Sequence, residues 1–216
     1  MNAFQKFFAN DRTMVVSFII ALICFIGATV FSFNVGLSMV VTNGLQLVFI
    51  IVLIWAFVKH EATIMHTVIG ASLIVYIISD ITAIIGDVSL VSFTGSIGIA
   101  YAISIIDAVL FVILFINHLA INSAHKSVNG KILFNQIIII ILAAYQIATM
   151  VILLVSGYTD ALSAVFIPLA KVFLFAMIVC IESKLNAYKL IREECQANGT
   201  WTDEMKENAK KYYFGE

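Results

Sequence analysis

Charged residues are scarce in this 216-residue chain: Lys, Arg, Asp and Glu make up only 12% of it, while 62% is hydrophobic. Water-soluble domains carry roughly twice that share of charge and about 45–50% apolar residues, so this composition excludes a soluble fold. One proline and eleven glycines exclude collagen-like and low-complexity classes. Three cysteines cannot form a disulfide framework. The net charge of −1 gives no reason to expect a nucleic-acid partner.

Long apolar segments fill most of the chain instead. A bilayer core about 30 Å thick is crossed by roughly 20 helical residues, because an α-helix rises about 1.5 Å per residue. Backbone polar groups find no partner in lipid, so long apolar runs predict helices and not strands. We therefore expect an all-α integral membrane protein in which residues 1–183 form six transmembrane helices, arranged as three consecutive hairpins in the lipid bilayer. The expected spans are 14–34, 37–58, 63–85, 95–117, 132–156 and 161–183.

The Lys and Arg residues fall almost entirely on one side of these expected spans. Eleven of the twelve precede the first span, follow the sixth, or lie between spans two and three or spans four and five. The connections at 35–36, 86–94 and 157–160 carry none. Because cytoplasmic segments are enriched in Lys and Arg, we expect a multi-pass protein of the plasma (cell) membrane with both termini in the cytoplasm.

Residues 184–216 are expected to form a cytoplasmic helical extension of the last span. No helix breaker occurs before Asn198-Gly199, a pair typical of a helix C-terminus. Thr200 followed by Asp203 then predicts the start of a second short helix. Two interpretations stay open for this tail. It lies on the lipid surface, or it is a docking surface for a cytoplasmic protein partner.

Asp80, Asp107 and Lys171 are ionisable residues well inside the expected spans, where charge is costly and points to function. Counted from the external ends of their helices, Asp107 and Lys171 are both near the middle of the membrane. An aspartate and a lysine at the same depth are each other's most economical partner, so we expect an ion pair or a shared ligand. Asp80 is only about five residues from the outer end of its span and is expected nearer the headgroups.

Uncharged polar residues recur at helical spacing in several spans. Ser38, Thr42 and Gln46 are four residues apart in one span, and Ser72, Tyr76 and Asp80 in the next. Such stripes face the interior of a bundle, because lipid offers no hydrogen-bond partners. The alternative is that these groups only hold the helices together. The candidate binding residues are Asp107, Lys171, Gln46, Asn43, Tyr76, Asp80, Tyr145 and Gln146.

No motif in the sequence predicts a catalytic site, a metal site or a cofactor. The segment His60-Glu61 with His66 lacks the four-residue histidine spacing of the zinc-protease motif. A metal held across helices, with help from Cys180 or Glu182, stays an alternative. No P-loop or Gly-rich dinucleotide motif is present. All four histidines are expected at the cytoplasmic boundary: His60, His66, His118 and His125.

Three functions are compatible with these features. The first is a small polytopic protein that binds or transports a small solute or ion in an outward-facing polar cavity between helices. The second is a non-catalytic membrane subunit or sensor that recruits a cytoplasmic partner through its C-terminal tail. The third, a membrane enzyme, lacks any recognisable nucleophile and base. The polar stripes and the charged pair favour the first.

Overall fold

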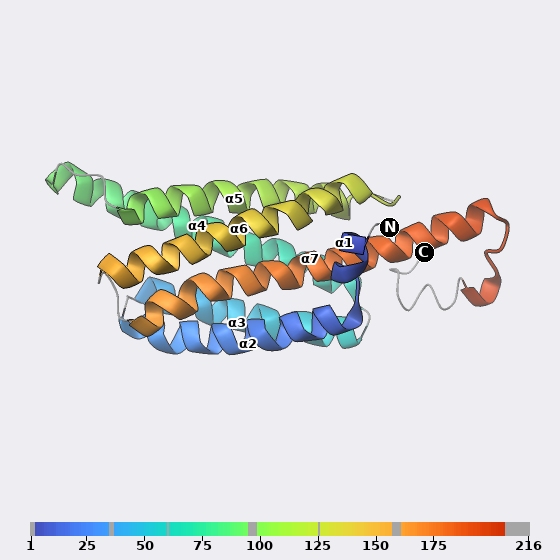
Figure 1. Ribbon diagram of the computed structural model, residues 1–216, viewed down its shortest axis with the longest axis horizontal. Helices are drawn as coiled ribbons and strands as arrows, with labels where there is room; N and C mark the ends of the chain where they lie inside the picture. Colours follow the sequence, from blue (N-terminus) through green and yellow to red (C-terminus); the bar gives the residue numbers. More distant parts are fainter. Residues whose placement is uncertain are drawn as a thin grey trace.

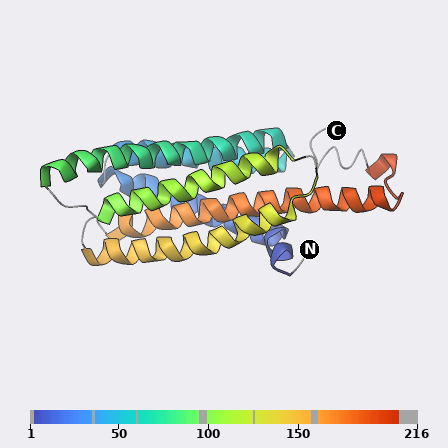
Figure 2. The ribbon, with the colours of Figure 1, turned by 90° about the horizontal axis from the view of Figure 1, so that it is seen from above.

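The computed structural model describes residues 3–34, 37–59, 61–94, 99–124, 126–156 and 161–205. Every regular element in these ranges is a helix, and six of the helices are long and apolar enough to cross a membrane. They lie side by side in one elongated bundle (Figures 1 and 2). The all-α fold and the six helices are therefore confirmed. In chain order the elements are α1 (Ala3–Phe8), α2 (Asp11–Phe31), the 3-10 helix η1 (Ser32–Asn34), α3 (Leu37–Val58), α4 (Ala62–Thr94), α5 (Ile99–Asn122), α6 (Asn129–Ser156) and α7 (Ala161–Ala197).

Helix α4 is longer than the sequence predicts. We expected the span to end near residue 85 and residues 86–94 to form an external loop, but the helix continues to Thr94. The prediction was wrong because hydropathy reports how much of a segment suits lipid, whereas helix length depends on breakers, and Gly86 alone does not end a helix. The next helix, α5, is displaced in the same direction: it runs from 99 to 122 where 95–117 was expected.

Helix α7 is the most enclosed of the six spans. In its most apolar stretch 67% of the residues are buried, compared with 22–39% in the other five. Helices α2 and α6 pack along it, and the other helices contact one another in chain order from α2 to α6. Each expected hairpin is thus a pair of touching helices. The other five helices surround α7, which lies mid-bundle in both views (Figures 1 and 2).

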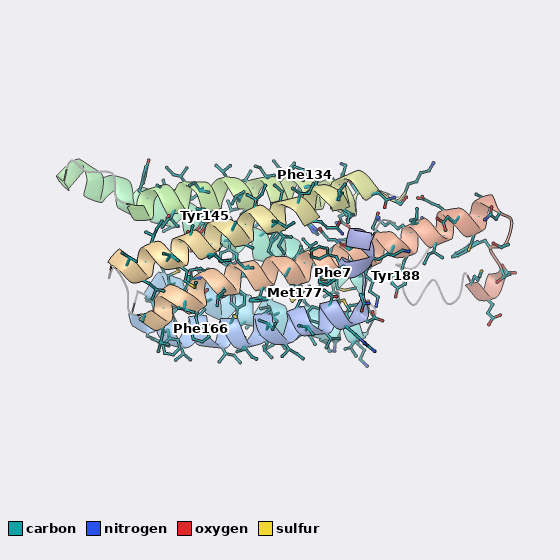
Figure 3. All side chains as sticks on the ribbon, in the orientation of Figure 1. Phe7, Phe134, Tyr145, Phe166, Met177 and Tyr188 are labelled. Atoms are coloured by element: carbon teal, nitrogen blue, oxygen red, sulfur yellow. The ribbon has the colours of Figure 1, made fainter. Side chains whose placement is uncertain are left out.

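The outer surface of the bundle is apolar, as a lipid-facing surface must be. Large aliphatic and aromatic side chains point outward from the helices, Phe134 on α6 among them (Figure 3). The largest buried side chains, which include Phe25, Phe111 and Phe175, fill the centre. A protein with this surface is stable in a bilayer and would aggregate in water, because large exposed apolar patches drive association. The structure thus agrees with a multi-pass membrane protein.

The C-terminal extension is helical over most of its described part; the predicted residues 206–216 lie outside the described residues. Helix α7 ends at Ala197, and Gly199 has a φ of 68°, a left-handed conformation that suits glycine. The start of the next short helix differs from expectation. The Met205 N–H donates to the Thr202 hydroxyl at 3.2 Å, whereas the Thr200 hydroxyl donates back to the Cys195 carbonyl at 3.3 Å. Thr202, and not Thr200, is therefore the capping residue.

The connection between α5 and α6 is fastened to this extension of α7. Glu193 accepts hydrogen bonds from the Ser127 N–H at 2.5 Å and from the Ser127 hydroxyl at 2.6 Å. Asn186 accepts from the Val128 N–H at 2.7 Å, and Lys189 donates to the Ala124 carbonyl at 2.8 Å. The segment 184–197 is therefore part of the folded bundle and not a free tail, and it projects from the same end as α1 (Figure 1).

Two helical glycines provide a test of how tightly α2 and α7 pack. A Cβ on Gly27 would lie under 3.0 Å from three ring carbons of Phe166, whose ring is stacked on Phe31; Phe166 is labelled in Figure 3. A Cβ on Gly44 would meet nothing within 4 Å. We expect Gly27→Ala to lower the free energy of unfolding by about 1–3 kcal/mol through overpacking. Gly44→Ala should be neutral or slightly stabilising. Thermal unfolding in detergent measures both, and equal effects would contradict the packing.

Candidate functional site

The ion pair between α5 and α7 is the centre of the site. The Lys171 ammonium donates directly to Asp107 Oδ2, which confirms the predicted pairing. Asp107 has no exposed surface, and Lys171 is 7% exposed. Asp107 Oδ1 is also engaged, because Gln146 on α6 donates to it at 2.7 Å. Three helices thus converge on one carboxylate, and both of its oxygens have partners.

A second carboxylate lies beside the same lysine. Asp80 Oδ1 on α4 is 3.8 Å from Lys171 Nζ. We expected Asp80 nearer the outer headgroups than Lys171, so its position is a correction. The estimate of depth assumed that its helix ends near residue 85, and since α4 continues to Thr94, Asp80 lies well inside the helix. The site therefore contains two buried carboxylates and one ammonium.

Two aromatic rings form a wall beside the ammonium. The Tyr76 and Phe111 rings are stacked, with centroids 4.8 Å apart and planes 9° apart. Lys171 Nζ lies 5.7 Å from the Tyr76 centroid and 5.9 Å from that of Phe111, within the range in which ring faces attract cations. Tyr76 lies one turn before Asp80, and Phe111 one turn after Asp107. The site thus stabilises positive charge with ring faces as well as with carboxylates.

Two polar oxygens of the site lack a hydrogen-bond partner. They are Tyr76 Oη and Asp80 Oδ2, both buried, and no donor or acceptor in the described part of the chain lies within bonding distance of either. Buried polar atoms are nearly always hydrogen-bonded, and an orphaned one costs about 1–3 kcal/mol. The two residues are four apart on α4, so both side chains lie on the same face. This is where a ligand would find free oxygen atoms.

Charge in the site does not balance. If both carboxylates are ionised, Asp80, Asp107 and Lys171 together carry a charge of −1 in a buried setting. Uncompensated buried charge is strongly unfavourable, so the site favours a further positive charge. A proton or a small monovalent cation would supply it. Among the described residues no group of three His, Cys, Asp or Glu side chains is placed to hold a metal ion, so a metal site formed by such residues across helices is not seen there.

Three of the predicted binding residues make other contacts. Gln46 and Ser72 bond reciprocally: Gln46 Nε2 donates to the Ser72 carbonyl at 2.8 Å, and the Ser72 hydroxyl donates to Gln46 Oε1 at 2.5 Å. Asn43 donates to the Ser32 hydroxyl at 2.7 Å. Tyr145 donates to the Ile103 carbonyl at 3.0 Å. These bonds join α3 to α4, α3 to η1, and α6 to α5, which is the role in helix association that we kept as an alternative.

Sequence reasoning missed a second buried polar cluster. His118 and Glu182 are only 1% exposed and contact each other inside the bundle, a pairing that we did not predict. The spacing carried a signal that we did not use: His118 is eleven residues after Asp107, and Glu182 eleven after Lys171. Eleven residues are close to three helical turns, so each residue lies on the same face as its counterpart. His60 and His125 are outside the described residues.

Comparison with protein-family models, with curated proteins and with solved structures finds no match to this chain. Its function must therefore be argued from the buried clusters themselves.

The loss in free energy of unfolding caused by a substitution in the site should depend on the unpaired charge that remains buried. Lys171→Gln leaves two buried carboxylates without a cation and should lower the free energy of unfolding by about 3–5 kcal/mol. Asp107→Asn should cost less, because Asp80 is near enough to pair with Lys171. Asp80→Asn leaves a balanced pair and should cost least. Thermal unfolding of the detergent-solubilised variants measures the order.

Lys184→Gln is the matched control, since it makes the same change on α7. Lys184 pairs with Asp11, whose side chain is 73% exposed, while the Lys184 side chain itself is 14% exposed and lies near the Phe57 and Tyr188 rings. Because solvent reaches Asp11 and screens the pair, such a pair contributes only about 0–1 kcal/mol, so this variant should be much less destabilised than Lys171→Gln. If Lys171→Gln is no more destabilising than Lys184→Gln, the buried cluster does not have the energetic role assigned to it.

Proposed function

We propose that this chain is a membrane protein of the transport class that binds a small cation between its helices. The observation that carries the proposal is the surplus carboxylate: Asp80 and Asp107 share a single ammonium, Lys171. The free oxygens of Asp80 and Tyr76 add two ligand atoms at the same place. Ionisable groups inside a membrane bundle typically mark a substrate, ion or proton pathway. The ligand class is therefore a proton or a small monovalent cation.

Lys171 allows the site to bind and release its ligand. Its ammonium bonds to Asp107 and is 3.8 Å from Asp80 Oδ1, so it is a built-in competitor for both carboxylates. When a cation or proton occupies Asp80, the ammonium is held by Asp107 alone. When the ligand leaves, the ammonium can move toward Asp80 and limit the cost of its bare charge. Binding and release then need only a small movement of one flexible side chain.

We further propose that the site opens to the outside and that both termini are cytoplasmic, in a plasma membrane. The support is the distribution of Lys and Arg, which flank the ends of the helices at one end of the bundle. The α1 helix and the extension of α7 lie at this end (Figure 1). Lys171 is ten residues from the start of α7 and therefore nearer the opposite end, from which we expect the ligand to enter through an outward-facing cavity.

Cation movement in liposomes tests the function. Purified protein is reconstituted, and proton entry is followed with an enclosed pH-sensitive dye while sodium entry is followed with a tracer. We expect the wild type to carry one of these ions above the level of empty liposomes. Asp80→Asn should reduce that flux at least tenfold, because it removes the surplus charge and leaves the Asp107–Lys171 pair.

Asp11→Asn is the control for this flux, since it makes the same chemical change at an exposed position and should keep the wild-type rate. Full flux in Asp80→Asn would place the ligand elsewhere. Wild-type protein that neither carries nor binds either ion would overturn the proposal.

The orientation is tested by cysteine labelling in intact cells. Cys24 and Cys180 are buried, and Cys195 can be replaced by serine to lower the background. A membrane-impermeant maleimide should label Asp87→Cys and Asp160→Cys, and should label Lys126→Cys only after the membrane is opened. External labelling at position 126 in sealed cells would reverse the orientation.

The second candidate is a non-catalytic subunit or sensor that recruits a cytoplasmic protein through its C-terminal extension. The observation that favours it is the fastening of segment 184–197 to the α5–α6 connection, which makes the extension a continuous part of the central helix. A change at the buried cluster could then be passed along α7. A protein without ion flux whose extension still binds a partner would select this candidate.

A further inference from the structure

A second acid–base cluster lies three helical turns along α5 and α7 from the first. His118 Nδ1 is 2.8 Å from Glu182 Oε1, and His118 Nε2 is 3.0 Å from the backbone carbonyl of His66 on α4. Asn135 on α6 donates to Glu182 Oε2 at 2.7 Å. The two clusters have the same plan: an acid–base pair joins α5 to α7, and an amide from α6 donates to the carboxylate.

The resemblance extends to the spacing on all three helices. His118, Glu182 and Asn135 are each eleven residues from their counterparts Asp107, Lys171 and Gln146. Helix α6 runs opposite to α5 and α7, and its spacing is reversed accordingly. At about 1.5 Å per residue, the clusters are about 16 Å apart along the bundle. They are two levels of one three-helix contact, with acid and base exchanged between α5 and α7.

The orientation of the Asn135 amide is fixed by its neighbours. Asn117 Nδ2 donates to the Lys131 carbonyl at 3.0 Å and to Asn135 Oδ1 at 2.6 Å. A backbone carbonyl only accepts, so Asn117 must present its amino group here. Asn135 therefore presents its oxygen to Asn117 and its amino group to Glu182. Glu182 Oε2 is consequently an acceptor in this network.

The hydrogen-bond partners of His118 then determine how many protons the His118–Glu182 pair holds. The carbonyl facing Nε2 only accepts, so Nε2 carries a hydrogen. The contact between Nδ1 and Glu182 Oε1 needs one hydrogen as well, on either atom. A neutral imidazole has one N–H and an ionised carboxylate has none, so the pair holds one proton more than these two forms supply. Since Glu182 also accepts from Asn135, the imidazolium–carboxylate form satisfies every contact.

We propose that the His118–Glu182 pair is a second proton-binding site of this protein, loaded with one proton in the conformation described. Other titratable groups near it are His66 on α4, with a ring centroid 5.5 Å from that of His118, and Lys189 on α7, which donates to the Ala124 carbonyl. The contacts of His118 account for one proton in the pair.

This site lies near one end of the bundle. Buried apolar side chains of α5 and α7, among them Phe111, Leu114, Leu174 and Ile178, occupy the turns between the two clusters. Protons do not cross such a layer without water or a conformational change. His118, however, is one turn from the end of α5, beside the connection to α6. His118 thus lies near the end of the bundle opposite to the one nearer Lys171.

Nitrogen NMR of the histidine rings tests the proposal without any transport assay. The variant His60→Gln/His66→Gln/His125→Gln retains His118 as the single histidine of the chain and keeps the backbone carbonyl at position 66. With ring nitrogens labelled, the full-length protein in detergent is titrated from about pH 5 to about pH 9. We expect both ring nitrogens to be protonated near pH 7 and one proton to be lost at higher pH.

Glu182→Gln in the same background should remove the doubly protonated form at pH 7, and Asn135→Leu is the matched control. Asn135→Leu removes one hydrogen bond to Glu182 but leaves the charge of the Glu182 carboxylate in place. The doubly protonated His118 ring should therefore persist, over a narrower pH range. If the variant protein with Glu182→Gln does not fold, infrared spectroscopy of the single-histidine protein shows whether Glu182 is a carboxylate or a carboxylic acid.

A neutral ring with one bare nitrogen at pH 7, together with an ionised Glu182, would overturn the proposal. This result is independent of the cation flux through Asp80, because the titration needs neither a gradient nor an added ion. Failure of the second proton site and failure of the proposed function can therefore be told apart.

Discussion

The Lys171 ammonium constrains the whole bundle, because a charge in a low-dielectric interior must be surrounded by partners. Its carboxylates come from α4 and α5, and the amide that supports one of them comes from α6. Helix α7 can satisfy this demand only from the middle of the bundle, which is where it lies, with α2 covering its other side. The apolar faces of the surrounding helices are then left to the lipid. The central placement of α7 is thus consistent with the needs of this buried charge.

Satisfaction of hydrogen bonds separates polar groups that hold helices together from those that are free to bind. Gln46 and Ser72 use each other's donors and acceptors, and Asn43 is bonded to Ser32, so these contacts leave little for a ligand. At Asp80 and Tyr76 one oxygen each stays unpaired although it is buried. Polar groups with all their hydrogen bonds made stabilise an arrangement of helices. Buried polar groups without a partner destabilise it unless a ligand supplies the missing contact. This difference, more than the presence of polar residues, distinguishes the cation site we propose.

The two acid–base clusters differ in charge although they share one plan. The Asp80–Asp107–Lys171 cluster has one carboxylate more than its ammonium can balance, while the contacts of His118 and Glu182 describe a neutral pair that holds a proton. Buried apolar side chains of α5 and α7 lie between them. A membrane protein that moves a charge between two sides needs sites of different affinity that do not open to both sides at once. The two clusters along α5 and α7 differ in charge, which is compatible with the transport function that we propose.

The amino-acid sequence by itself determined the membrane class, the six helices and the pairing of Asp107 with Lys171. Composition decides whether a segment is stable in lipid, and the fixed rise of a helix converts residue number into depth. The depth predicted for Asp80 was wrong, because we placed the end of α4 at the end of its apolar stretch, whereas the helix continues to Thr94. The burial of His118 was not predicted either, because it depends on Glu182 and Asn135 from two other helices. Which faces meet is set by the rotation and crossing of all six helices, and only their mutual packing decides that.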